Sequence, residues 1–436
     1  MQLTYPDWLP YLLNALVHLV NTLTGQSFAI QWPPEVLLVI WGVVLFTLIA
    51  IVAQAAVIFM VLMERKVLAW MTQRKGPNRV GPWGLLQTLA DGVKLLFKED
   101  IMHTEQDKFM STVGPAIFFI PCFVLFAFLP FSSEILGLAI PAGALLVFAI
   151  SSLSVVGIVM AGWASNNKYS LLGGMRSAAQ AISYEIPLVL AVLGVVLATG
   201  TLNIRDIINA QEGGFWNWFA IALTPISFMI FFIASIAEVN RIPFDLPEAE
   251  SELVSGYNTE YSGMKFALFF LAEYASLFAM CGFTVSFFFG GYHSPFYIPQ
   301  THGFVLPFLF HGAPVPLLWL MTQVEMLFWF LAKVYVFIFV AMWWRATLPR
   351  LKPDQLMGFS WKFLIPLSLI NIFVLAIGKF ALAPSPDHSE PIAIFSANGW
   401  LPWVEWAVFA CVCYWAFFAF SSKLFTQKLQ ARLADR

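Results

Sequence analysis

The stretch VLLVIWGVVLFTLIAIVAQAAVIFMVLM, residues 36–63, contains no charged side chain. A helix that crosses a bilayer needs about 20 mostly apolar residues, and this run is longer than that. In lipid the backbone polar groups must be paired within the segment, so long continuous apolar runs indicate helices rather than open strands. Eight further runs of this kind follow at 111–130, 141–163, 179–200, 216–237, 266–290, 323–344, 362–382 and 401–420. The sequence therefore predicts an all-α polytopic membrane protein with about nine transmembrane helices.

The composition of the chain agrees with a membrane protein. Of its 436 residues, 60 % are hydrophobic and only 11 % are charged, whereas soluble domains carry about 25 % charged residues. A water-soluble fold is therefore excluded. Disorder is excluded as well, because disordered chains combine low hydrophobicity with high charge. The formal net charge of −2 gives no reason to expect a nucleic-acid partner.

The distribution of basic residues predicts the orientation of these helices. All but three of the 23 Lys and Arg residues lie in or beside alternate connecting segments or in the C-terminal tail, the exceptions being Arg205, Lys333 and Lys379. Basic loops face the cytoplasm or the mitochondrial matrix. We therefore expect the N-terminus outside and the C-terminus inside. The N-terminus lacks a basic region typical of a cleaved signal peptide.

Three regions are predicted along the chain. Residues 1–34 form an N-terminal extension whose interrupted apolar stretch is more typical of an interfacial helix than of a span. Residues 35–382 form the membrane core. Residues 383–436 form a C-terminal extension that contains the ninth predicted span.

The loop after the first span combines basic residues with helix breakers. Residues 64–100 read ERKVLAWMTQRKGPNRVGPWGLLQTLADGVKLLFKED. Their Gly and Pro residues impose turns, and from Leu85 to Phe97 apolar residues recur at helical spacing. A basic anchor on anionic lipid is one interpretation, but the density of turn residues favours an ordered docking and substrate-entry loop.

An acidic segment on the same side of the membrane gives the strongest signal. Residues 237–274 read AEVNRIPFDLPEAESELVSGYNTEYSGMKFALFFLAEY and carry many carboxylates but only two basic residues. So many carboxylates cannot all ionise cheaply unless they are hydrated or share protons. Apolar residues interleaved with the acids indicate a folded, partly buried loop. A proton-handling cluster is therefore favoured over a solvated acidic loop.

Two further spans carry charged side chains at a high insertion cost. Glu185 lies near the start of the fourth run, and Lys333 lies within the seventh, which also contains Glu325. A charged group at the bilayer centre costs about 2.5–3.5 kcal/mol on insertion scales, so it must face protein or water and usually marks a functional site. Snorkelling toward the interface is the alternative for either residue.

The chain shows no cofactor motif of its own. The four cysteines have no metal-ligand spacing and the six histidines are scattered. There is also no dinucleotide or P-loop glycine pattern. We therefore expect no metal, flavin or iron–sulfur cluster on this chain.

The quoted motifs resemble the quinone-facing membrane subunit of NADH:quinone oxidoreductase (respiratory complex I), which is the H subunit in bacteria and NADH dehydrogenase subunit 1 in mitochondria. The resemblance covers roughly residues 35–382, and ERKVLAWMTQRKGPNRVGP and FDLPEAESELVSGYNTEYSGMKFALFF are its most specific parts. It implies a subunit that joins the hydrophilic and membrane arms, forms much of the quinone chamber and couples quinone reduction to proton pumping. The chain would not be catalytic alone.

The resemblance also implies roles for individual residues. The quinone cavity would be lined by Arg65, Arg74, Asp91, Arg241, Asp245, Lys333 and Arg345. The proton route would use Glu185, Glu238, Glu248, Glu250, Glu252 and Glu273. Quinone would be the substrate, and partner subunits would hold the flavin and the iron–sulfur clusters. The expected partners are iron–sulfur and quinone-site subunits of the hydrophilic arm, small membrane-arm subunits and the lipid bilayer. The location would be a bacterial inner membrane, with the mitochondrial inner membrane as the alternative.

Three other interpretations of the sequence remain. The related membrane subunit of energy-converting hydrogenases shares parts of these loops, but the fit along the entire first loop favours the quinone enzyme. A secondary transporter would show paired broken helices and an inverted repeat, and no repeat is evident. A structural anchor without chemistry would leave Glu185, Glu273 and Lys333 unexplained.

Overall fold

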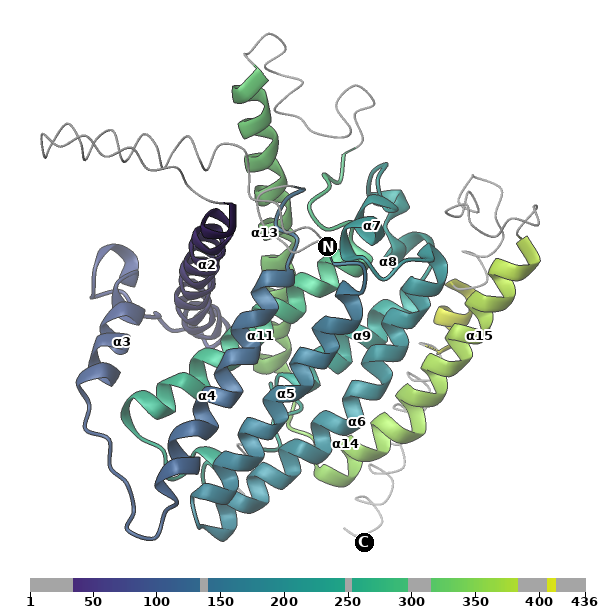
Figure 1. Ribbon diagram of the computed structural model, residues 1–436. Helices are drawn as coiled ribbons and strands as arrows, with labels where there is room; N and C mark the ends of the chain where they lie inside the picture. The colour runs from purple at the N-terminus through teal and green to yellow at the C-terminus, as the bar shows by residue number, and fades with distance from the viewer. Residues whose placement is uncertain (1–33, 134–139, 248–252, 297–314, 383–405, 413–436) are drawn as a thin grey trace, which may run out of the picture. The chain divides into compact units, whose positions relative to one another are not determined.

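The computed structural model describes residues 34–133, 140–247, 253–296, 315–382 and 406–412. The chain divides into two compact units, Met1–Ala56 and Val57–Arg436. In the first unit the described residues are helical and belong to α2 (Pro34–Met71). The second unit holds the rest of α2 and all the other described elements (Figure 1).

The second unit is built from helices along its described length. In chain order they are η1 (Pro82–Gly84), α3 (Gln87–Phe97), α4 (Lys108–Val124), η2 (Leu125–Phe128), α5 (Gly143–Ala164), α6 (Lys168–Thr199), α7 (Ile204–Asn209), η3 (Phe215–Asn217), α8 (Phe219–Ala222), α9 (Pro225–Glu238), η4 (Gly256–Asn258), α11 (Gly263–Phe288), α13 (Val315–Thr347), α14 (Pro353–Phe359), η6 (Ser360–Leu364) and α15 (Ile365–Leu382).

Six stretches of the described residues are long and apolar enough to cross a membrane. They are Lys108–Phe128, Gly143–Ala164, Lys168–Thr199, Gly263–Phe288, Trp319–Thr347 and Pro353–Ile377. The predicted class of polytopic helical membrane protein is confirmed, and these six match six of the nine predicted runs. The exact count of nine is not confirmed.

The remaining three runs differ in what the structure describes. The run 36–63 lies within the single helix α2. The run 216–237 is not one continuous helix, because η3 and α8 precede α9 and only Pro225–Glu238 forms a longer apolar helix. Pro225 stands at the first turn of α9, where a missing N–H costs least. Most of the run 401–420 lies outside the described residues.

The predicted regional boundaries stay a prediction, because most of 1–34 and 383–436 lies outside the described residues. Within the C-terminal region, residues 406–412 are helical. The Trp406 indole donates a hydrogen bond to the carbonyl of Ile221 at 2.7 Å, which ties this short helix to α8.

Close helix packing depends on a few glycines. A Cβ added at Gly157 of α5 would lie 2.5 Å from the backbone nitrogen of Phe118 on α4. A Cβ added at Gly173 of α6 would lie 2.8 Å from the Cα of Gly256, at the start of η4. Small residues let membrane helices approach closely, since lipid offers no hydrophobic drive for their association.

The proline within α6 is compensated by a neighbouring helix. Pro187 has no N–H, so the carbonyl of Ser183 one turn earlier loses its helical partner. The hydroxyl of Ser360, at the start of η6, donates to that carbonyl at 2.6 Å. The Tyr184 hydroxyl donates to the carbonyl of Leu356 in α14 at 3.0 Å. These bonds fix the start of the α14–α15 region against α6.

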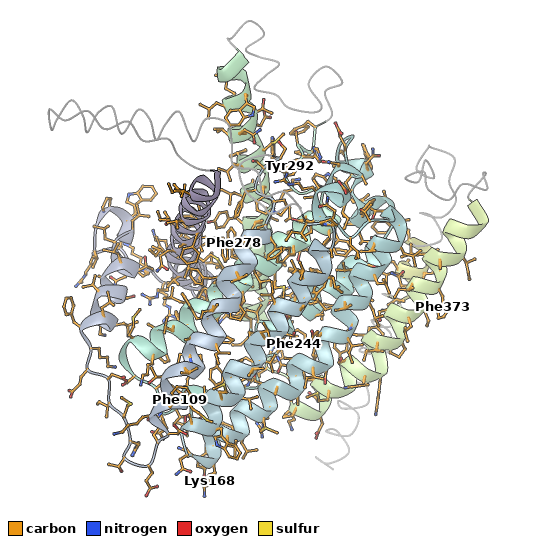
Figure 2. All side chains as sticks on the ribbon, in the orientation of Figure 1. Phe109, Lys168, Phe244, Phe278, Tyr292 and Phe373 are labelled. Carbon is orange, nitrogen blue, oxygen red and sulfur yellow. The ribbon has the colours of Figure 1, made fainter. Side chains whose placement is uncertain are left out.

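We name the two ends of the second unit after Lys168 and Tyr292, which Figure 2 labels. The Lys168 end carries the segments 98–107, 165–167 and 348–352, and the Tyr292 end carries the segments 200–203 and 289–294. At the Lys168 end the Tyr261 hydroxyl donates to the carbonyl of Ala161 at 3.2 Å. Burial raises the pKa of Tyr261 to about 12, so this phenol stays a donor.

Candidate functional site

A buried carboxylate near the end of α2 joins two arginines from distant parts of the sequence. Glu64 is 3 % exposed. Its carboxylate oxygens accept hydrogen bonds from Nη1 of Arg241 at 3.2 and 3.3 Å. The guanidinium of Arg345, in the last turn of α13, forms an ion pair with the same carboxylate. Arg241 also lies over the ring of Tyr274, 4.1 Å from its centroid.

The segment after α9 that carries Arg241 is folded and buried. Asn240 has a left-handed backbone (φ 55°), which turns the chain sharply at the end of the helix. The amide of Gln180, on α6, donates to the carbonyls of Ala237 and Phe244, each at 2.7 Å. The expected folded character of the acidic loop is therefore present where the structure describes it, up to residue 247.

A second ion pair lies on the same segment. Asp245 is 7 % exposed, and its carboxylate accepts a hydrogen bond from Arg350 at 2.7 Å. Counting this pair with Glu64, Arg241 and Arg345, three guanidinium groups face two carboxylates. We call Glu64, Arg241, Asp245, Arg345 and Arg350 the arginine cluster; the formal charges of these five side chains sum to +1.

Three more of the predicted cavity residues, Arg65, Arg74 and Asp91, belong to the loop that follows Glu64 in the sequence. Arg65 pairs with Asp91 of α3 at 2.5 Å, and Gln87 donates to the same carboxylate at 3.1 Å. The side chains of Arg65 and Asp91 are 42 % and 33 % exposed, so solvent screens this pair. Arg74 is exposed.

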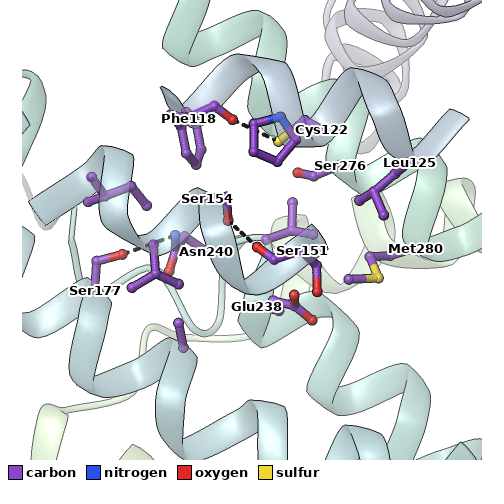
Figure 3. A pocket seen from close by; sticks show the side chains of 15 residues that line it. Phe118, Cys122, Leu125, Ser151, Ser154, Ser177, Glu238, Asn240, Ser276 and Met280 are labelled. Atoms are coloured by element: carbon purple, nitrogen blue, oxygen red, sulfur yellow. Dashed lines mark hydrogen bonds between the residues drawn. The ribbon is translucent and has the colours of Figure 1, made fainter. Parts of the chain in front are cut away.

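A small cavity lies among α4, α5, α6, α9 and α11 (Figure 3). It offers about 30 Å³ to the centres of water molecules. Glu238 and Asn240 line it together with four serines and Cys122. Among the described atoms, one carboxylate oxygen of Glu238 and the amide oxygen of Asn240 are buried without a hydrogen-bond partner. A polar cavity of this size has room for about two waters.

Two further carboxylates, Glu185 and Glu273, lie near this cavity, and we call Glu185, Glu238 and Glu273 the acidic set. Glu273, on α11, is 7 % exposed and accepts a hydrogen bond from the Tyr257 hydroxyl at 3.0 Å. Glu238 and Glu273 both lie within electrostatic range of the Cys122 thiol, and Glu185 of α6 lies within range of Glu238. The structure thus brings three of the six predicted proton-route residues to one region. Glu248, Glu250 and Glu252 lie outside the described residues.

Lys333 is placed away from the arginine cluster. Its ammonium donates to the carbonyls of Phe289, Gly291 and His293, which follow α11 at the Tyr292 end. Arg345 stands twelve positions later on the same helix, about 18 Å along its axis. The structure does not bring Lys333 together with the other predicted cavity residues, so its assignment to the quinone cavity stays a prediction.

Two residues of this site did not stand out in the sequence. Glu64 was visible as an acid at the end of a span, next to Arg65 and Lys66, and that position could have suggested a buried ion pair. Gln180 gave no signal, because an amide in an apolar run is common. Among the described residues, no group of His, Cys, Asp and Glu could hold a metal ion.

Comparison with known proteins identifies the family. Residues 43–376 match the family model described as NADH dehydrogenase. The chain is 46 % identical over 342 residues to the H subunit of NADH-quinone oxidoreductase from Brevibacillus brevis, covering 77 % of this chain and 94 % of that protein. It is 42 % identical over 357 residues to the protein of the same name in Dehalococcoides mccartyi, covering 82 % and 90 %. It is 48 % identical over 333 residues to that of Geobacillus thermodenitrificans, covering 76 % and 92 %. The chain therefore belongs to the NADH dehydrogenase family of membrane subunits, together with the H subunits of NADH-quinone oxidoreductase, an enzyme complex.

Proposed function

We propose that this chain forms the membrane wall of the quinone chamber of complex I and couples quinone reduction to proton translocation. The observation that carries the proposal is the arginine cluster. Glu64 is buried and bonded to Arg241 and Arg345, so a single carboxylate joins α2, the segment after α9 and α13. Burial of charged groups carries a desolvation cost that pairing offsets only in part, so stability alone does not account for this junction.

The chemistry of the cluster suits a quinone. The two carbonyl oxygens of a quinone headgroup accept hydrogen bonds, and guanidinium groups supply planar donors in a fixed geometry. The excess positive charge favours a ligand that gains electron density on reduction. In this proposal Arg65, Arg74 and Asp91 of the first loop stand near the entry, and Arg241, Asp245 and Arg345 line the chamber.

The acidic set supplies the coupling route. Glu238 lines a water-sized cavity that contains two unpaired acceptor oxygens. Glu185 lies within electrostatic range of Glu238, and Glu273 lies within range of Cys122, which lines the same cavity. Carboxylates separated by water are the usual parts of a proton relay in a membrane protein. We propose that Glu248, Glu250 and Glu252 link this set to the chamber. A change of charge in the chamber would then shift protons among these carboxylates.

The remaining parts of the reaction belong to partners. Quinone is the proposed substrate, and flavin and iron–sulfur clusters reside in partner subunits. The proposed neighbours are iron–sulfur and quinone-site subunits of the hydrophilic arm and small subunits of the membrane arm. The three relatives named above are bacterial, which supports a bacterial inner membrane as the location.

Substitution of Glu64 tests the chamber. In the assembled complex, E64Q should raise the KM for quinone about tenfold, since a loss of about 1.4 kcal/mol of binding is a factor of ten. The reason is that a neutral amide leaves Arg241 and Arg345 without their shared counter-ion. NADH oxidation with ferricyanide should persist, because that electron path ends in the hydrophilic arm. Steady-state kinetics on equal amounts of complex, quantified on native gels, measures both.

The matched control is D100N, another acid-to-amide change. Asp100, whose side chain is 37 % exposed, pairs with the mostly buried Lys265 at 3.1 Å in the 98–107 segment, and neither residue belongs to the arginine cluster. D100N should leave the KM unchanged. An assembled E64Q complex with the parental quinone KM and turnover would refute a role of the arginine cluster in the chamber.

A further inference from the structure

The three donors of Lys333 are matched by three backbone acceptors. Its ammonium lies 2.8 Å from the carbonyl oxygen of Phe289, 2.8 Å from that of Gly291 and 2.7 Å from that of His293. It also lies 4.5 Å from the centre of the Trp218 ring. An ammonium has three N–H donors, whereas a neutral amine has two. The three carbonyls therefore match the donors of the charged form, and they oppose the burial that disfavours a charge here.

Lys333 has no carboxylate at ion-pair distance among the described residues. The described ion pairs of Glu64, Asp91, Asp100, Asp245 and Glu260 are made with other basic groups. The nearest acid on its own helix, Glu325, stands eight positions earlier, about 12 Å along the axis. Asp206 and Glu212 act instead on Tyr292, and burial raises the pKa of that phenol to about 12, so it adds no negative charge. Lys333 thus contributes a positive charge that no carboxylate neutralises directly.

Aromatic packing separates this charge from the acidic set. Phe228 of α9 contacts Phe288 and Phe289, with ring centroids 6.0 and 5.0 Å apart, and Phe231 contacts Phe287 at 5.9 Å. Glu273 lies sixteen positions before Phe289, about 24 Å along a helix axis. Glu273 therefore lies in the first half of α11, whereas the carbonyls that bind Lys333 follow the last residue of that helix.

We propose that Lys333 is a fixed cation that blocks protons at the Tyr292 end of the subunit, so that the acidic set exchanges protons only with the Lys168 side and the neighbouring subunits. The inference rests on the proposed acidic route. A route that also opened at the Tyr292 end would let protons leak across the membrane without work. A fixed positive charge in a constriction excludes protons, as it does in other membrane pores. In this proposal the packed rings of Phe228, Phe231 and Phe287 to Phe289 occupy the space that a chain of water would need.

Passive proton leak of the assembled complex tests this proposal without turnover. The complex is reconstituted in liposomes with pyranine inside, and a K⁺ diffusion potential with valinomycin drives protons across the membrane in the absence of NADH. K333Q removes the charge and keeps an amide donor beside the carbonyls of Phe289, Gly291 and His293. It should dissipate the proton gradient at least tenfold faster per complex than the parental enzyme. K333R keeps the charge and should hold the gradient.

A second variant cancels the charge without removing the lysine. H293D places a carboxylate on a residue whose carbonyl already binds the ammonium, and it should leak as K333Q does. This variant decides the question if K333Q does not assemble. Y292F is the packing control, because it removes the hydrogen bond of Tyr292 to Asn209 (2.9 Å) in the same loop and leaves Lys333 charged. It should hold the gradient.

Two results would overturn the proposal. One is a parental leak rate in both K333Q and H293D. The other is a leak in Y292F as fast as that in K333Q, which would assign the seal to packing alone. Failure of the proposed chamber and coupling role would appear elsewhere, as parental quinone kinetics in E64Q.

Discussion

Glu185 shows how a single carboxylate in a membrane helix gains significance from its surroundings. It is half-buried on α6, two positions before Pro187, and lies within electrostatic range of Glu238. From the sequence, a snorkelling residue and a proton carrier were both reasonable. The structure places Glu185 within electrostatic range of Glu238, which lines a polar cavity, and the proposed proton route uses this proximity.

We predict that E185Q assembles but slows quinone reduction, and that proton pumping falls with it. A neutral amide is cheaper to insert than a carboxylate, so assembly should persist. Positioned proton-transfer groups contribute about 10²–10⁴-fold, so a loss of at least about tenfold is expected. E185D keeps a titratable group with a shorter reach and should be intermediate. Rates are measured on equal amounts of complex; an E185Q enzyme that turns over and pumps at the parental rate would make Glu185 a structural residue.

At the scale of elements, the contact between α6 and the η4 segment positions Glu273. The Ser170 hydroxyl of α6 donates to the carbonyl of Tyr257 at 3.3 Å, and the Tyr257 hydroxyl donates to Glu273 at 3.0 Å. Gly173, one turn after Ser170, allows the two backbones to meet. The position of the Glu273 side chain therefore depends on close contact between α6 and η4, which are far apart in the sequence.

We predict that G173A destabilises this contact by about 1–3 kcal/mol, the usual cost of overpacking. The added Cβ would lie 2.8 Å from the Gly256 Cα and from the Tyr257 nitrogen, so the η4 segment must move. The temperature at which the purified complex loses half its quinone reductase activity should fall. G92A is the matched control, because a Cβ at Gly92 of α3 would meet nothing within 4 Å. Equal thermal inactivation of the two variants would show that the contact is not needed.

At the scale of the whole molecule, the chain has the architecture of a polytopic helical membrane subunit. The described residues provide six candidate spans, a cationic cluster and an acidic cavity. They include no group of His, Cys, Asp and Glu suited to a metal. The relatives of the chain are subunits of a larger enzyme complex, and the proposed function assigns the redox centres to partner subunits.

We predict that the chain expressed alone and placed in liposomes neither oxidises NADH nor reduces quinone. The reason is that an electron path needs the flavin and the iron–sulfur clusters proposed for partner subunits. Spectrophotometric assays of both reactions check this, with the assembled complex as the positive control. Quinone turnover by the single chain would contradict the assignment of the redox centres to partners.

The sequence by itself determined the fold class and the family. Uncharged runs such as 36–63 can satisfy their backbone in lipid only as helices, and motifs such as FDLPEAESELVSGYNTEYSG are long enough to be specific. Apolar residues among the acids also predicted a buried loop, which Phe244 and Leu246, 4 % and 2 % exposed, bear out where the structure describes it. The prediction that 216–237 forms one continuous span was wrong, because the hydropathy of the run does not reveal the break in the helix before Pro225.

Only the tertiary structure decided which charges meet. Glu64 and Arg241 are separated by 177 positions yet form one buried ion pair, and no local pattern encodes such a pairing. The same holds for Lys333, which the family resemblance grouped with Arg345 in the quinone cavity. The carbonyls that bind Lys333 come from the chain after α11. Ionic partners are chosen by the packing of helices, and packing depends on close backbone approaches that a single sequence does not reveal.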